Sequence, residues 1–309
     1  MTRDRIDETR LTMPAPGRNI WFYEMEGSEK DSSHGMKIEA VLLEKRSEFQ
    51  DILVFRNRTF GQVLVLDGII QLTEFDQSGY HEMIAHVPLL CHPHPRRVLV
   101  IGGGDGGTVT QVVKHPEVER VVLCEIDRAV VEVCRENFPA LTRALSDPRV
   151  SVIYGDGAAY AAEHPGGFDV IIVDGPDPVG PAEVLFTRPF YQTLAETLSP
   201  GGIAVTQAES LFYHPGFIAG LLGFISEIFP VAAHYTTKVP TYPSGMIGFN
   251  FCSLGPRPTA QDTARAAGLP DLEYYSPAVH QAAFALPPRI LNRLPEKVKR
   301  LHESLTANG

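Results

Sequence analysis

The chain has 309 residues, of which 44% are hydrophobic and 21% are charged, and its formal net charge is −10 at pH 7. This length and composition are typical of a globular protein with one large domain or two smaller ones. The acidic balance argues against a nucleic-acid-binding protein, which needs a basic surface. The longest apolar runs are too short to cross a bilayer, so we expect neither nucleic acid nor membrane as a partner.

Residues 1–19 are polar and punctuated by proline and glycine, and we expect them to form a flexible N-terminal arm. They contain no apolar segment of a secretory signal, which indicates a cytoplasmic protein. The four cysteines are Cys91, Cys124, Cys134 and Cys252. Because they form no CxxC pair and two of them lie in apolar stretches, we expect buried free thiols.

A strand-rich segment follows, and we assign residues 20–78 to an N-terminal β-domain. Its stretches KIEAVLLEKRS, QDILVFRN and QVLVLDGIIQLTEF are rich in Val, Ile and Leu, as strands are. The dipeptide Asp67-Gly68 between VLVL and IIQL is typical of a hairpin turn.

From residue 79 the pattern changes, and we assign residues 79–309 to a second domain. GYHEMIAHVPLLC is typical of a helix, and five apolar strand candidates (RRVLVIGG, VERVVLCEID, RVSVIYGDG, FDVIIVDG and GIAVTQAES) then alternate with helical stretches. Short apolar strands separated by helices indicate a parallel sheet covered on both faces. The expected fold is therefore α/β and Rossmann-like, and VAAHYTTKVPTYPSGMIGFNFCSLG predicts an antiparallel hairpin at the sheet edge.

Acidic residues follow the predicted strands at the edge where a doubly wound sheet binds its ligands. The first strand ends in the glycine loop that contains Asp105, and the next strands end at Glu125, at Asp156-Gly157 and at Asp174. Glu125 lies about twenty residues past the glycines, where an acidic side chain accepts hydrogen bonds from ribose hydroxyls. The Asp156-Gly157 pair is placed to bind an adenine amine.

Asp105 distinguishes the kind of ligand that this loop binds. A pyrophosphate needs unobstructed backbone N–H groups and a positive helix terminus. A carboxylate inside the loop repels phosphate and attracts a sulfonium or an ammonium. The loop therefore favours a cationic nucleoside over a dinucleotide.

The order of several motifs resembles that of the polyamine aminopropyltransferases, the spermidine synthase family. These motifs extend from about residue 20 to 290 and include QDILVFRNRTFGQVLVLDGIIQLTE, YHEMIAHVPL, VLVIGGGDGG, FDVIIVDGPDPVGPAEVLF, PTYPSG and YYSPAVHQAAFALP. The resemblance implies an S-adenosyl-type, Rossmann-like catalytic domain in a homodimer or homotetramer. It implies transfer of the aminopropyl group of decarboxylated S-adenosylmethionine, a co-substrate, to an amine, usually putrescine. No prosthetic group or metal is implied, and 5′-methylthioadenosine is released.

The resemblance also implies roles for individual residues. The residues implied to hold the donor are Gln50, Gly102, Gly103, Gly104, Asp105, Glu125, Asp156, Gly157, Asp174 and Pro181. The residues implied to line the acceptor groove are Trp21, Tyr80, His81, Asp105, Asp174, Gly175, Pro176, Asp177, Gln207 and Tyr242. Asp105 and Asp174 would grip the donor's ammonium, Trp21 would close one end of the groove, and the catalytic residues would be Asp174, as proton acceptor, with Tyr80 and Tyr242.

Three stretches depart from the family pattern. Gly175-Pro176 replaces two small, usually hydroxyl-bearing residues, and Phe75 and Gln77 replace an arginine and a glutamate of the usual TERDEF stretch. Thr110-Gln111 replaces an Arg-Glu pair after the glycine loop. Because the first two departures flank the acceptor groove, the amine stays open among putrescine, cadaverine, agmatine and spermidine.

Two other functions stay open at this level. An S-adenosylmethionine-dependent N-methyltransferase of polyamines would share the scaffold, although Asp105 would repel the carboxylate of that donor. A non-catalytic nucleoside- or polyamine-binding paralogue would treat DGPDP as a turn. A zinc site is not expected from HEMIAH, because His81 and His86 lie about 140° apart on a helix.

Overall fold

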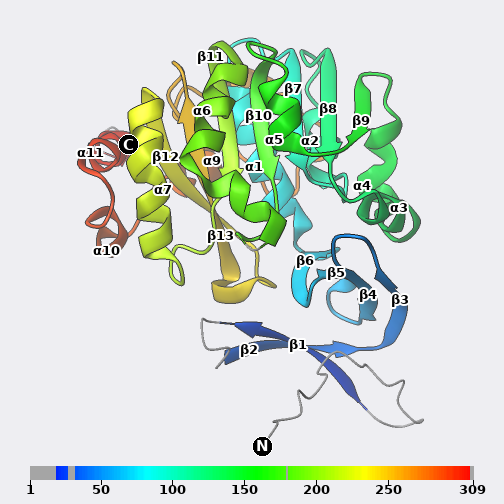
Figure 1. Cartoon of the computed structure of the whole chain (residues 1–309). Helices are drawn as coiled ribbons and strands as arrows, with labels where there is room; N and C mark the ends of the chain where they lie inside the picture. The colour runs from blue at the N-terminus through cyan, green and yellow to red at the C-terminus, as the bar shows by residue number, and fades with distance from the viewer. Residues whose placement is uncertain (1–18, 27–31, 179, 307–309) are drawn as a thin grey trace, which may run out of the picture.

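The computed structural model describes residues 19–26, 32–178 and 180–306, so the predicted N-terminal arm lies almost entirely outside the described residues (Figure 1). The strands of the described residues form a two-stranded, a four-stranded and a seven-stranded sheet. The strands are β1 (Ile20–Glu26), β2 (Ser32–Ile38), β3 (Ala40–Arg46), β4 (Asp51–Asn57), β5 (Gly61–Leu66), β6 (Ile69–Thr73), β7 (Arg97–Gly102), β8 (Arg120–Glu125), β9 (Val150–Tyr154), β10 (Phe168–Asp174), β11 (Leu198–Gln207), β12 (Val231–Lys238) and β13 (Met246–Ser253).

Helices fill most of the chain between the strands of the large sheet. The α-helices are α1 (Gln77–Cys91), α2 (Gly107–Val112), α3 (Arg128–Asn137), α4 (Pro139–Thr142), α5 (Gly157–Ala162), α6 (Arg188–Thr197), α7 (Pro215–Ile228), α8 (Thr263–Ala267), α9 (Pro277–Ala283), α10 (Pro288–Leu291) and α11 (Glu296–Thr306). The 3₁₀-helices are η1 (Arg143–Ser146), η2 (Gly180–Phe186) and η3 (Pro243–Gly245).

The seven-stranded sheet has the order β12-β13-β11-β10-β7-β8-β9. Strands β7 to β11 pair in parallel, whereas β12 and β13 pair antiparallel with each other and β13 with β11. The predicted α/β fold and its antiparallel edge hairpin are thus confirmed. The chain runs outward from β7 through β8 to β9 and then returns to β10, so a ligand crevice is expected beyond the ends of β7 and β10.

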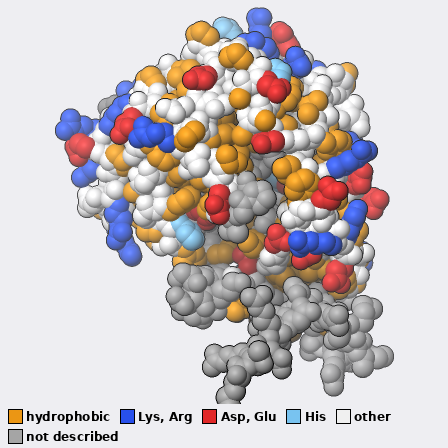
Figure 2. Space-filling model, viewed as in Figure 1, with side chains coloured by type: hydrophobic (Ala, Val, Ile, Leu, Met, Phe, Trp, Pro, Cys, Tyr) orange, Lys and Arg blue, Asp and Glu red, His pale blue; other side chains and the backbone are white. Residues whose placement is uncertain are grey.

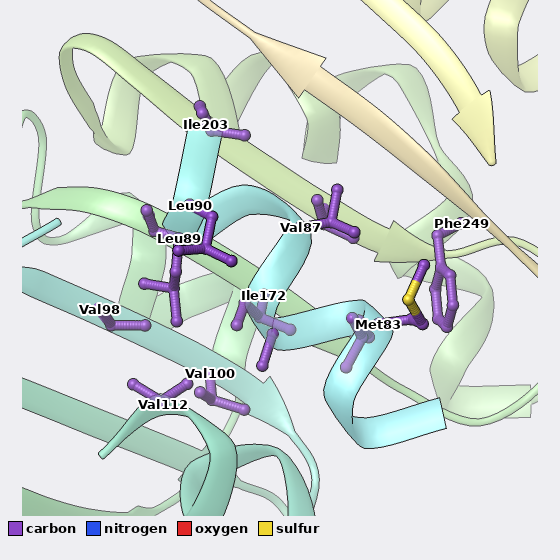
Figure 3. Close-up of a cluster of buried hydrophobic side chains, with 14 of the residues drawn as sticks. Met83, Val87, Leu89, Leu90, Val98, Val100, Val112, Ile172, Ile203 and Phe249 are labelled. Atoms are coloured by element: carbon purple, nitrogen blue, oxygen red, sulfur yellow. The ribbon is translucent and has the colours of Figure 1, made fainter. Parts of the chain in front are cut away.

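Helix α1 packs across one face of this sheet and carries site residues in its first turn. Figure 3 shows Met83 and Val87 of α1 among side chains of the sheet that include Val100 and Ile172. All four of these side chains are fully buried. This packing holds the N-terminal turn of α1, with Tyr80, against the carboxyl ends of the strands.

Helices α5, α6 and α7 cover the opposite face, where they bury side chains such as Ala161, Leu194 and Leu222. Helix α7 has no counterpart among the predicted elements. Its sequence, PGFIAGLLGFISEI, contains three glycines inside an apolar run, and each glycine costs a helix about 1 kcal/mol relative to alanine. Burial against the sheet offsets this cost, which only tertiary packing provides.

The four-stranded sheet packs against α3, and this contact joins the N-terminal strands to the large sheet. Ile52 and Leu64 lie in one apolar cluster with Val130 and Cys134. The predicted hairpin turn is present, since Asp67 and Gly68 have φ values of 48° and 83° between β5 and β6. The division of the chain into domains at residue 78 stays a prediction.

Three further expectations concern the surface and the cysteines. All four cysteines are free and buried, as predicted. Figure 2 shows basic and acidic side chains interspersed over the visible face, with no single basic patch there. Within the described parts of the chain, no helix has the length and apolar character needed to span a membrane.

Candidate active site

A cavity of about 880 Å³ opens beyond the carboxyl ends of the parallel strands. The glycine loop after β7, the ends of β8 to β11, the first turns of α1, the turn before β4, and strands β5 and β6 all contribute to its lining. The predicted residues that line it are Gln50, Tyr80, His81, Gly102, Gly103, Gly104, Asp105, Glu125, Asp156, Gly157, Asp174, Gly175, Pro176, Asp177, Gln207 and Tyr242.

Two predicted site residues are not found in this lining. Trp21 is 47% exposed on β1 and stacks on Tyr23, with ring centroids 6.4 Å apart. The strand meets the cavity at Tyr23, Glu24 and Met25, so Trp21 adjoins the lining only through its stacking on Tyr23, and its closure of the groove stays a prediction. The side chain of Pro181 lies outside the part of the chain that the structure describes.

The glycine loop lies directly against the end of β10. Gly102 has a φ of 77° and Gly103 a φ of 68°, and the Gly103 N–H donates to the Asp174 carbonyl oxygen over 2.8 Å. A Cβ on Gly102 would collide with that carbonyl oxygen. The loop therefore needs glycine both for its left-handed backbone and for this close approach.

We expect the substitution Gly102→Ala to abolish binding at the cavity, whereas Gly166→Ala will not. Both glycines have positive φ values, but nothing lies within 4 Å of a Cβ on Gly166. The control variant, Gly166→Ala, thus costs only the strain of a left-handed alanine, about 1–2 kcal/mol. Gly102→Ala must in addition displace the backbone of β10. Calorimetric binding of 5′-methylthioadenosine, the nucleoside that the sequence resemblance implies, to both variants measures this, and equal binding by the two would contradict it.

Asp174 is held by two hydroxyl groups at the floor of the cavity. The Tyr80 hydroxyl donates to its Oδ1 over 2.7 Å, and the Thr108 hydroxyl donates to its Oδ2 over 2.6 Å. Burial raises the pKa of Asp174, and the nearby charge of Asp105 raises it further. An aspartate with a raised pKa is suited to accept a proton.

Asp105 stays anionic although it is equally enclosed. Its Oδ1 accepts the Gly107 N–H over 2.6 Å and faces His81 Nε2 at 3.3 Å. Burial opposes the charge, but His81 and this N–H outweigh it and lower the pKa of Asp105. Two neighbouring carboxylates with opposite pKa shifts can divide the work of binding a cation and accepting a proton.

Aromatic rings form one wall of the cavity. Tyr80 packs edge-on against Tyr242, with ring centroids 6.2 Å apart, and the Tyr242 hydroxyl donates to the Gln71 carbonyl oxygen over 2.6 Å. Burial raises the pKa of both tyrosines well above its usual range. Both hydroxyls are therefore protonated donors at neutral pH.

The buried carboxylate of Asp76 fixes the loop that carries Tyr242. It accepts hydrogen bonds from the Thr241 N–H over 2.8 Å and from the Thr73 hydroxyl over 2.7 Å. Asp76 therefore ties this loop to the start of α1. Sequence reasoning missed this role, because the contact joins residues that lie far apart in the chain.

The end of the cavity near β8 and β9 is built around Glu125. Its carboxylate accepts the Gly104 N–H over 3.1 Å and the Asp127 N–H over 2.8 Å, and burial raises its pKa to about 7. The Gln50 amide donates to Asp127 over 2.8 Å. Asp156 caps α5 by accepting the Ala158 N–H on Oδ1 over 2.8 Å.

The opposite end of the cavity holds a pair of acids beside Gln207. Burial raises the pKa of Asp177, and burial together with the charge of Asp177 raises the pKa of Glu209 to about 8. Glu209 also has a φ of 63°, a strained value for a residue other than glycine. Strain of this kind clusters at functional sites, and Glu209 also lines the cavity, although the sequence pattern GIAVTQAES predicted only a strand there.

The second histidine of HEMIAH lies away from the cavity. His86 is fully buried, and its Nδ1 lies 2.9 Å from His115 Nε2 in the core. Over residues 19–26, 32–178 and 180–306, no three His, Cys, Asp or Glu side chains form a group that could hold a metal ion.

Comparison with known proteins identifies relatives along most of the chain. Residues 77–261 match the family model described as "Spermine/spermidine synthase domain", and residues 20–74 match "Spermidine synthase tetramerisation domain". A polyamine aminopropyltransferase of Leptospira biflexa is 48% identical over 270 residues, which are 87% of this chain and 95% of that protein. A spermidine synthase of Dictyostelium discoideum is 45% identical, over 87% of this chain and 95% of that protein.

Solved structures of similar proteins share the fold. A spermidine synthase in complex with the transition state analogue AdoDATO superposes with a TM-score of 0.87 at 37% identity, covering 94% of this chain and 99% of that one. The spermidine synthase of Thermotoga maritima superposes with a TM-score of 0.85, also at 37% identity and with the same coverage.

Proposed function

Because this chain belongs to the spermidine synthase family of aminopropyltransferases, we propose that it transfers an aminopropyl group from decarboxylated S-adenosylmethionine to putrescine. The products are spermidine and 5′-methylthioadenosine. The observation that carries the proposal is the pair of enclosed carboxylates, Asp105 and Asp174, beside the glycine loop. A pair of anions at this place fits the ammonium of the donor and excludes a phosphate.

Two sets of contacts support the orientation of the donor. Glu125, with Gln50 held nearby through Asp127, is suited to the ribose hydroxyls, and Asp156 to the adenine amine. Asp105 then accepts the ammonium at the far end of the aminopropyl chain. Intact S-adenosylmethionine carries a carboxylate there, which Asp105 repels, and this charge disfavours an N-methyltransferase.

The reaction needs one proton acceptor and no acid for the leaving group. The attacking amine nitrogen forms a bond to the carbon next to sulfur, and the carbon–sulfur electron pair returns to sulfur, which leaves as a neutral thioether. An alkyl amine has a pKa near ~10.4 in water, so it must lose a proton before it attacks. We assign this proton to Asp174, whose raised pKa suits a base.

The acid pair at the opposite end supports a diamine as the acceptor. Asp177 and Glu209 lie at the same end of the cavity as Gln207, and the second ammonium of putrescine would favour the charged form of both carboxyl groups, whose pKa values are raised in its absence. Tyr80 and Tyr242 line the groove between the two ammonium sites. Aligning the two substrates in this groove can lower the barrier by roughly 7–11 kcal/mol.

We also infer a homo-oligomer in which residues 20–78 form the N-terminal domain and residues 79–309 the catalytic domain. The match of residues 20–74 to a tetramerisation domain supports this inference. The exposed apolar side chains of β1, Trp21, Tyr23 and Met25, are suited to such a contact, which would then lie at the edge of the cavity that Tyr23 and Met25 line.

An acceptor panel tests the proposed function. The protein is incubated with decarboxylated S-adenosylmethionine or S-adenosylmethionine and with putrescine, cadaverine, agmatine or spermidine, and the products are weighed by mass spectrometry. We expect aminopropyl transfer from the decarboxylated donor only, fastest with putrescine. A methylated amine as the sole product would overturn the assignment, and so would binding of both substrates without release of 5′-methylthioadenosine.

The substitution Tyr80→Phe is expected to move the acid limb of the kcat profile to higher pH. The Tyr80 hydroxyl stabilises the charged form of Asp174, and a hydrogen bond to a charged group contributes about 1.5–3 kcal/mol. Its loss raises the pKa of Asp174, so the base is protonated over a wider range of acidic pH. The expected shift is about 1–2 pH units, measured by release of 5′-methylthioadenosine.

The matched control for this experiment is Tyr160→Phe on α5, outside the cavity lining. Its profile should coincide with that of the unaltered protein. If the acid limb of the Tyr80→Phe profile has the same midpoint as that of the unaltered protein, the Tyr80 hydroxyl does not affect the proton acceptor.

A further inference from the structure

Three side chains link the start of α1 to the glycine loop. Gln77 Oε1 lies 2.8 Å from His81 Nδ1, and His81 Nε2 lies 3.3 Å from Asp105 Oδ1. The His81 side chain is 3% exposed, and its ring packs so closely on Gly107 that a Cβ there would collide with it. The ring is therefore held in place, and its protonation state acts directly on Asp105.

Gln77 can serve both protonation states of this imidazole. When His81 is charged, its Nδ1 donates to the Gln77 carbonyl oxygen and its Nε2 donates to Asp105. When His81 is neutral, the Gln77 amide turns over and donates to Nδ1, while Nε2 still donates to Asp105. A carboxylate at position 77 could only accept, and it would hold His81 in the charged form.

We propose that Gln77 is a positioning residue that lets His81 release its proton to solvent when the cationic donor binds at Asp105. This inference rests on the proposed function, which brings an ammonium between Asp105 and Asp174. A charged His81 and that ammonium are like charges competing for the same carboxylate. Release of the proton removes the competition without breaking either hydrogen bond of the imidazole.

The charges around His81 support this exchange. Burial disfavours the charged imidazole, but Asp105 from the glycine loop, Asp174 from β10 and Glu82 from α1 outweigh it and raise the pKa of His81. An ammonium bound between the two aspartates cancels much of their effect, so the pKa of His81 falls in the complex. By linkage, donor affinity decreases as the pH falls below the pKa of the free protein.

Equilibrium binding between pH 6 and 9 tests the inference with two probes. Decarboxylated S-adenosylmethionine carries the ammonium, and 5′-methylthioadenosine lacks it. In the unaltered protein we expect the ratio of the first probe's affinity to the second probe's to fall by up to about tenfold per pH unit on the acidic side. Taking the ratio removes the titration of Glu125, which both probes share through their ribose. In Gln77→Glu the fall should begin about 1 pH unit higher or more, because a second anion stabilises the charged imidazole.

The variants and outcomes are distinguishable. A glutamate at the first residue of α1 favours the helix N-terminus, so Gln77→Glu is compatible with the fold. Gln192→Glu on the exposed side of α6 adds the same charge outside the cavity and should match the unaltered protein. Coincident profiles for Gln77→Glu and the unaltered protein would overturn the inference. If the protein binds 5′-methylthioadenosine but does not bind decarboxylated S-adenosylmethionine at any pH, the proposed function is overturned, and the inference with it.

Discussion

The substitution Asp174→Asn is expected to reduce kcat by about 10²–10⁴-fold, the contribution of a positioned general base. Asparagine keeps the shape of the side chain but cannot take a proton from the attacking amine. In the proposed binding mode Asp105 would still offer an anion to the donor's ammonium, so the dissociation constant of the donor should change far less than kcat. Release of 5′-methylthioadenosine measures the first quantity and calorimetry the second.

Asp271→Asn is the matched control for this substitution. Asp271 is exposed, lies outside the cavity and has a φ of 48°, which asparagine adopts readily. Its kcat should equal that of the unaltered protein. Full turnover by Asp174→Asn would exclude Asp174 as the proton acceptor and leave the Asp105 assignment untouched.

Of the substitutions considered, Glu82→Gln is expected to lower the free energy of unfolding most, by about 2–4 kcal/mol. It removes an anionic acceptor from three buried or part-buried backbone N–H groups. The Glu82 carboxylate is 1% exposed and accepts these bonds from Glu273, Tyr274 and Tyr275 over 2.6–2.9 Å. The three bonds tie the C-terminal segment to α1. An amide at position 82 would place an N–H donor against donors.

Hydrogen exchange at the amides of residues 273–275 and the midpoint of thermal unfolding check this prediction. Exchange at these amides should accelerate, because their local opening becomes easier. Glu273→Gln is the control, since the Glu273 side chain is exposed and only its backbone N–H takes part. Unchanged exchange in Glu82→Gln would show that the segment is held by its apolar contacts instead.

Local rules were sufficient to predict the main layout of the fold. The strands around VLVIG and FDVIIVD are short continuous apolar runs that end at glycine or aspartate, and YHEMIAHVPL is an apolar stretch of helical length, so the parallel sheet and α1 follow from adjacent residues. The acids Asp105, Glu125 and Asp174 converge because the carboxyl ends of parallel strands share one edge. Asp67-Gly68 predicts its hairpin locally, since the turn depends on two neighbouring residues.

Tertiary structure alone decided contacts between segments that are distant in the chain. The hydrogen bond between the Thr241 N–H and Asp76, which fixes the loop of Tyr242, joins residues more than 160 positions apart. The strained φ of Glu209 is likewise a property of the folded backbone. Helix α7 forms despite its glycines because packing against the sheet stabilises it. The sequence by itself determined which side chains reach the carboxyl edge of the sheet. The opposite pKa shifts of Asp105 and Asp174 depended on burial, on neighbouring charge and on hydrogen bonds, which exist only once the chain is folded.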